Sequence, residues 1–247
     1  METSAQPDGQ QVNTPKVYPL IETPQYATKQ TDKLTLMATE MACVHNCILR
    51  CLNAIHKHAP TVQPAEYEAF ISFVRIWYTM VMKHHDGEEQ YIFPRFQEQI
   101  HPEAMVVSQQ EHEAFHDGME EMMKYVNGLK GRENEFDRVE FCRIMDSFSD
   151  ALVTHLRNEV PAILKLGELG DVDAISKIWD SAVQEDIKKF KMVDFITLLP
   201  LAIFSHDAEY EGGLHRDFPP LPAAMKFVVR RVLSRPYQGA WKFLVTA

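Results

Sequence analysis

The stretch FISFVRIWYTMVMKHHDGE, residues 70–88, decides the fold prediction. Its apolar residues recur at steps of four and three, and the stripe they form runs straight into His84 and Glu88. Such steps place side chains on one face of an α-helix, because the helix has about 3.6 residues per turn. The stretch therefore predicts a bundle helix in which two potential metal ligands take core positions.

Three other segments repeat this arrangement, with apolar stripes over residues 41–55, 112–126 and 141–159. A lone histidine on an apolar face is usually a satisfied core residue. That explanation would here have to hold at seven positions on four helices, whereas a bound cation explains all of them, since it offsets the cost of polar groups in a core. The seven candidate metal ligands are His45, His84, Glu88, His112, His116, His155 and Glu159.

The second helix carries a tandem pair, with His85 next to His84 and Glu89 next to Glu88. The apolar stripe leads into His84 and Glu88, and their neighbours are rotated by about 100° around the helix. We therefore expect His84 and Glu88 to be the ligands. His85 and Glu89 would be outer partners of the ligands or alternative ligands.

The ligand types narrow the choice of metal. The absence of a thiolate from the set excludes iron–sulfur clusters and thiolate zinc sites. Imidazole combined with carboxylate suits iron, and manganese or zinc as substitutes. Seven ligands are too many for one ion and suit two, with bridging carboxylates that would hold the ions roughly 3.5–4 Å apart.

Composition bounds the class of protein and its partners. A chain of 247 residues can form one substantial core, and its formal net charge of −10 argues against a nucleic-acid partner. The N-terminus has no apolar segment of the secretory type, and the longest apolar run, residues 195–204, falls short of the roughly 20 residues of a membrane span. Four cysteines are too few for a disulfide scaffold. We expect a cytoplasmic protein with no membrane partner.

No segment shows convincing strand alternation, so the predicted fold class is all-α. Residues 1–30 are expected to form an irregular arm, residues 31–168 a four-helix bundle, and residues 169–247 a helical extension packed on the same domain. Predicted helices cover residues 31–58, 64–94, 102–128, 135–166, 171–189 and 223–235, and residues 192–204 form a strongly apolar stretch.

Two further clusters could be metal sites, but a structural explanation is favoured for both. Cys43, Cys47 and Cys51 lie on the back of the first helix, where small apolar residues would be covered by residues 192–204. His206 and His215 flank the glycines of a polar loop, and their spacing matches no helical ligand pair, which favours a capping role.

The ordered motifs resemble the hemerythrin family, the HHE cation-binding domain, over about residues 34–168. The whole chain resembles the longer fungal-type hemerythrin-like proteins. This resemblance implies a non-haem di-iron site in an up-down-up-down four-helix bundle. It also implies that one iron is held by His112, His116 and His155 and the other by His45 and His84, with Glu88 and Glu159 as bridges.

The resemblance departs from the oxygen carriers of the family at one position. In those members the last carboxylate follows its histidine by five residues, and that position is Val160 here. Glu159 follows His155 by four, which is the pattern of other HHE proteins. Simple oxygen carriage is therefore less well supported than membership of the family.

Two functions are compatible with this site. One is a di-iron, O₂-dependent oxidoreductase that acts on a small, apolar organic substrate, with no catalytic residue beyond the metal centre. The alternative is a protein that binds, stores or senses O₂, nitric oxide or iron without turnover. Five neutral imidazoles against two carboxylates favour the alternative, because they stabilise ferrous iron. The extension of about 80 residues favours the oxidoreductase, because it could build a substrate pocket, and we lean toward that function.

Overall fold

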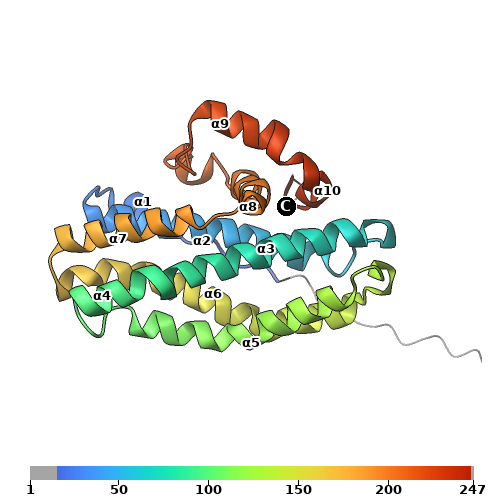
Figure 1. Ribbon diagram of the computed structural model, residues 1–247, viewed down its shortest axis with the longest axis horizontal. Coiled ribbons are helices and arrows are strands. Elements are labelled where there is room, and N and C mark those ends of the chain that lie inside the picture. Colours follow the sequence, from blue (N-terminus) through green and yellow to red (C-terminus); the bar gives the residue numbers. More distant parts are fainter. Residues whose placement is uncertain (1–15, 246–247) are drawn as a thin grey trace, which may run out of the picture.

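The computed structural model describes residues 16–245, and all regular elements in that range are helices. Four long helices lie side by side (Figure 1). They are α2 (Lys33–His58), α3 (Tyr67–Gly87), α5 (Val106–Gly128) and α6 (Arg138–Leu169). Both α2 and α5 pack against α3 and α6, which closes the group into a four-helix bundle around one apolar core. The predicted all-α bundle is confirmed.

Aspartates fix where several of these helices begin. The side chain of Asp32 accepts a hydrogen bond from the backbone nitrogen of Thr35, and Asp137 accepts from those of Val139 and Glu140. Each cap satisfies backbone donors that have no partner in the first helical turn. The starts of α2 and α6, and with them the positions of their core residues, are therefore set locally.

The prediction that the second bundle helix ends by Pro94 is wrong. The helix that begins with α3 continues as a π-helical turn (Glu88–Ile92) and then as α4 (Phe93–Gln99). Pro94 falls in the first turn of α4, where a missing backbone N–H costs little. π-helical turns are frequent at functional sites, and this one begins three residues after His85.

The chain beyond residue 170 forms a further layer on the bundle. It contains α7 (Val172–Lys188), α8 (Met192–Ser205), α9 (Ala223–Val228) and α10 (Gln238–Val245). Figure 1 shows α8, α9 and α10, in orange to red, stacked over α2 and α3, and the contacts place α7 against α2, α3 and the π-helical turn. Sequence patterns did not predict α10.

The cysteine row on the back of α2 is covered as expected. Cys43, Cys47 and Cys51 are buried, and the thiol of Cys47 lies 3.8 Å from the carbonyl oxygen of Ala202 on α8. Burial raises the pKa of Cys43 to about 12 and that of Cys51 well above its usual value. The row therefore lies in the packed interface between α2 and α8, as small apolar residues would.

The N-terminal arm is more ordered than predicted over its described part. It contains a short helix, α1 (Pro24–Thr28), whereas residues 1–15 lie outside the described residues. The amide of Asn46 accepts from the backbone nitrogen of Ile21 and donates to its carbonyl oxygen, both at 2.8 Å. Asn53 pairs with the backbone of Tyr18 in the same way. Two side-chain amides thus hold the arm against α2.

Candidate metal centre

Each bundle helix places at least one imidazole or carboxylate in the same part of the core. His45 comes from α2, His112 from α5, and His155 with Glu159 from α6. The end of α3 and the π-helical turn supply the rest. The side chains form two groups whose ligand atoms lie within 4.8 Å of one another, namely His85, Glu88, His112 and His155, and His45, His84, Glu88 and Glu159.

The first group is fully buried and rich in histidine. The Nε2 atoms of His112 and His155 are 3.2 Å apart, and Glu88 Oε2 lies 3.6 Å from His112 Nε2. His85 packs its ring against both of these histidines, with centroid distances of 4.5 and 5.0 Å. Three imidazoles and one carboxylate oxygen therefore converge on one small volume.

The second group has two imidazoles and two carboxylates. The Nε2 atoms of His45 and His84 are 2.9 Å apart. Glu159 Oε2 lies 3.3 Å from His45 Nε2, and Glu88 Oε1 lies 3.1 Å from His84 Nε2. His84 is the only partly exposed member, with 15% of its side chain accessible.

The two carboxylates lie between the groups. Glu88 turns one oxygen toward His84 and the other toward His112. Glu159 Oε2 lies 3.3 Å from His45 and 3.8 Å from His155. Glu88 belongs to both groups and turns one oxygen to each, as a carboxylate between two neighbouring ions would. Glu159 belongs to the second group, and its bridging role stays a prediction.

Protein groups alone leave this cluster unsatisfied. Both oxygens of Glu88 and of Glu159, and both ring nitrogens of His85, are buried without a hydrogen-bond partner in the described part of the chain. Burial, and then the neighbouring imidazoles, lower the pKa of His84 and His85 well below the usual value, and burial raises that of Glu88. The imidazoles are neutral and turn their ring nitrogens toward one another, and the carboxylates lack hydrogen-bond partners. A bound cation would provide the missing partner for both kinds of group. The residues therefore fit a pair of metal ions.

Two of the outward-facing ring nitrogens are held by further partners. His45 Nδ1 donates to the carbonyl oxygen of Leu156 at 2.7 Å, and His112 Nδ1 lies 2.7 Å from Glu89 Oε1. Such contacts orient an imidazole and keep its other nitrogen available to a metal. Glu89 is thus an outer partner, one of the two roles expected for it. His155 Nδ1 lies 3.5 Å from Glu111 Oε2, and neither atom forms a hydrogen bond in the described part of the chain.

His116 does not join the cluster, which corrects the prediction. Its side chain is 48% exposed and lies near Asp117 and Glu120. The buried stripe of α5 steps from His112 by three residues to Phe115, and not by four to His116. Phe115 then packs against His85, which occupies the place expected for His116.

His84 and His85 both reach the centre, although the apolar stripe singles out only His84. The two groups lie side by side at the end of α3, so neighbouring positions 100° apart can each face one of them. Two residues beside the candidate centre were not predicted. Glu111 precedes His112 with no spacing signal, and Trp179 lines the neighbouring cavity from α7, far away in the sequence.

A cavity of about 190 Å³ adjoins the second group. His84 and Glu88 line its inner end, and Trp179, Val183 and Asp186 of α7 close its outer side. The wall residues from α2 and the π-helical turn are Glu40, Met41, Val44 and Ile92. The extension beyond the bundle therefore forms part of the surroundings of the candidate metal centre.

Within the described residues, His206 and His215 belong to neither metal group. His215 Nε2 lies 2.8 Å from the hydroxyl of Thr23 and 3.3 Å from Glu211 Oε2, and Glu211 also accepts from the backbone nitrogen of Thr23. His206 Nε2 donates to the carbonyl oxygen of His215. These contacts fasten the N-terminal arm to the loop after α8.

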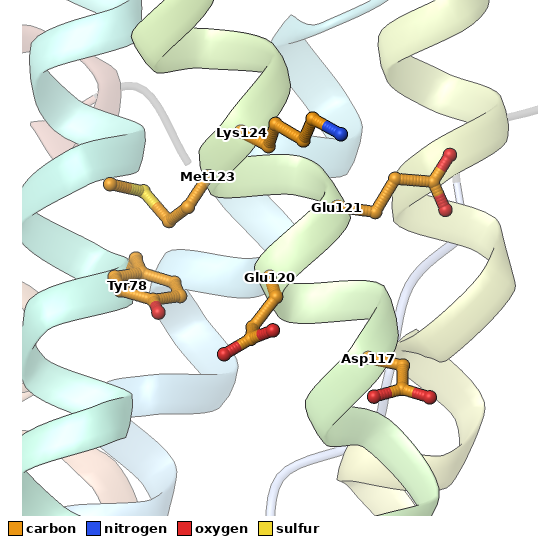
Figure 2. Close-up of a pocket in the computed structure, with 6 residues that line it drawn as sticks. All are labelled: Tyr78, Asp117, Glu120, Glu121, Met123 and Lys124. Carbon is orange, nitrogen blue, oxygen red and sulfur yellow. The ribbon is translucent and has the colours of Figure 1, made fainter.

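A larger depression on the bundle surface lies apart from the cluster. It has a volume of about 520 Å³ and is lined by Tyr78 of α3 and five residues of α5. Figure 2 shows Glu120 and Met123 turned toward Tyr78, and Asp117 and Glu121 turned to the other side of α5. None of its lining residues is a candidate ligand. In addition, no helix within residues 16–245 combines the length and apolar character that crossing a membrane requires.

Four helices that direct histidines and glutamates into one core define a class of helix-bundle protein with a candidate histidine–carboxylate metal centre. Residues 37–161 match the family described as the hemerythrin HHE cation binding domain, and the chain belongs to this family. It is 32% identical over 232 residues to the dimeric xanthone biosynthesis cluster protein R11 of Cryptosporiopsis sp. (strain 8999), an alignment covering 92% of this chain and 85% of that protein. No solved structure matches.

Proposed function

We propose that this protein holds two iron ions and uses O₂ to oxidise a small organic molecule. The observation that carries the proposal is the cavity between the bundle and α7, because it ends at His84 and Glu88. A family domain that only binds metal does not need such a compartment. Here the wall is completed by residues that lie beyond the matched range of 37–161.

The residues would divide unequally between the two ions. His85, His112 and His155 would hold one ion, and His45 and His84 the other. Glu88, which belongs to both groups, would be one bridge, and Glu159, 3.3 Å from His45 and 3.8 Å from His155, would be the second. The ion with two imidazoles has more room for an external ligand, and the cavity adjoins that side. Open coordination positions of this kind characterise catalytic metal sites. Manganese or zinc could occupy the same ligands.

A pair of iron ions would supply the electrons that reduction of O₂ requires. The chain provides a partly enclosed place for the reaction. Met41, Trp179 and Val183 are apolar lining residues of the cavity and limit the access of bulk water to it. Glu89 holds the outer ring nitrogen of His112, so that this imidazole keeps its orientation.

The size of the cavity limits the substrate. Pockets that enclose a whole drug-sized ligand measure roughly 300–1,000 Å³. At about 190 Å³ the cavity admits O₂ together with a small molecule, or one end of a larger molecule. The relative is named for a dimeric xanthone biosynthesis cluster, which supports a substrate from small-molecule biosynthesis.

Anaerobic loading with Fe(II), followed by exposure to O₂ under optical spectroscopy, tests the proposal. Consumption of O₂ that is not reversed when the gas is removed supports an oxidase. A Trp179→Ala variant, which opens the cavity without touching a ligand, should then change the rate of O₂ consumption and leave the metal content unchanged. A fully reversible optical change in both proteins would contradict the oxidase.

A second candidate function is binding, storage or sensing of O₂, nitric oxide or iron without turnover. The observation that favours it is the ligand balance. Of the seven side chains in the two groups, five are imidazoles and only Glu88 and Glu159 are carboxylates. Neutral ligands stabilise ferrous iron, and the reversible optical change described above would support this function.

A further inference from the structure

The mouth of the cavity carries two carboxylates from different elements. Glu40 lies on α2, and Asp186 lies on α7, outside the range matched by the family. Neither forms an ion pair with a lysine or arginine within residues 16–245. Lys83, whose charge reaches Asp186, is bound instead to the buried Asp194 at 3.2 Å. The mouth therefore has a local excess of negative charge.

The position of Asp186 depends on a close approach between α7 and α3. Gly87 has no side chain, and a Cβ built there would lie 3.2 Å from Asp186 Cγ. Gly87 directly precedes Glu88, so Asp186 at the mouth packs against the residue before a candidate ligand. The carboxylates thus extend from the surface to the candidate ligands.

The inner end offers groups that lack partners. Glu88 is 1% exposed, lines the cavity and has no hydrogen-bond partner on either oxygen. His84 lines the same cavity and is the one partly exposed histidine of the two groups. A cation that enters at Glu40 and Asp186 would therefore meet the stronger set of ligands, His84 and Glu88, at the inner end of the same cavity.

The carboxylate of Glu89 offers no comparable route. Its Oε1 lies 2.7 Å from Nδ1 of His112, so an ion held there would have to displace this contact and turn the ring before it reached the cluster. The cavity, in contrast, is lined directly by the candidate ligands His84 and Glu88.

We propose that Glu40 and Asp186 form a capture site for a divalent cation, from which the ion passes through the cavity to His84 and Glu88. This proposal rests on the proposed metal centre and adds the route by which the centre is loaded. It uses electrostatic focusing, in which a cleft lined by one sign of charge raises the local concentration of the opposite ion. Because the sites at the mouth are only two carboxylates, the ion is held there briefly.

Uptake of Co²⁺ by the full-length chain, freed of metal with a chelator, tests the proposal by stopped-flow absorbance. The double variant Glu40→Gln/Asp186→Asn keeps the shape of the mouth and removes its charge. We expect its uptake at low ionic strength to be about tenfold slower, with two ions bound at the end, and the difference to shrink as salt is added. Circular dichroism checks that the variant keeps its helix content.

A matched control removes two carboxylates elsewhere on the bundle. Asp117→Asn/Glu120→Gln changes the net charge equally, in the surface depression of Figure 2. Its uptake rate should equal that of the unmodified chain. Equal rates for all three proteins would overturn the capture site while leaving the two-ion centre intact, and equal slowing of both variants would show a general charge effect instead. A chain that binds no Co²⁺ at all would overturn the metal centre as well.

Discussion

The thiol of Cys47 lies 3.8 Å from the carbonyl oxygen of Ala202, deep between α2 and α8. This contact joins the family bundle to the segment that follows it. Leu198, Leu201 and Ile203 of α8 are buried in the same layer. We therefore propose that residues beyond 168 belong to the same domain as the bundle.

Truncation after Gly170 should destabilise the bundle and its metal centre. It would expose the back of α2 and remove Trp179 from the side of the cavity. Each large apolar side chain contributes about 1.5–3 kcal/mol when buried, and several of them equal the stability of a typical domain. We expect the fragment to aggregate or to lose its metal, as measured by light scattering and metal analysis. A soluble, monomeric fragment that binds two ions would show that the extension is a separate module.

His85 and His116 should differ sharply in their effect on metal content. His85 belongs to the first group, whereas His116 is exposed on α5. His85→Ala should therefore lower the content to about one ion per chain, and His116→Ala should leave both ions in place. Metal analysis of the two purified variants checks this directly. The reverse order would mean that His116 turns inward when metal binds.

The sequence was sufficient for the bundle because steps of three and four in the apolar residues report which face of each helix is buried. The sequence was less reliable for deciding which of two neighbouring residues on a helix points into the core. Steps of three and four alternate, so His112 could be followed by Phe115 or by His116, and only packing against α3 decides between them. The same limitation explains why His85 was ranked below His84.

Other features depend on contacts between distant parts of the chain. Trp179 and Asp186 reach the cavity because α7 folds back on the bundle, and no local pattern marks them as site residues. The π-helical turn after Glu88 carries no recognised signature either. Pro94 suggested an end to the helix because proline usually breaks one, yet here it begins the next helical segment.

Removing Glu89 should weaken metal binding without removing a ligand. Its carboxylate lies 2.7 Å from His112 Nδ1 and orients that ring. Loss of such an outer partner typically costs 10–100-fold in metal affinity, and we expect Glu89→Ala to fall in this range. Titration against a competing chelator measures the change. Glu113→Ala, an exposed position one residue beyond His112, is the control and should have no effect.

His56 should make stability depend on pH. Burial lowers its pKa to about 4, so the unfolded chain binds a proton at higher pH than the folded one. Stability from the neutral ring is present above about pH 6.5 and is lost as pH falls toward 4, by about 3 kcal/mol in total. The difference in free energy of unfolding between the unmodified chain and His56→Gln should therefore shrink between pH 7 and pH 4. A constant difference in urea unfolding would contradict this assignment.

The central claim is that two metal ions share Glu88 and Glu159 and divide five histidines between them. Anomalous diffraction at the iron absorption edge, from crystals of protein purified with iron, tests it most directly. We predict two peaks, one among His85, His112 and His155 and the other between His45 and His84. A single peak, or a peak next to His116 or His215, would contradict the claim.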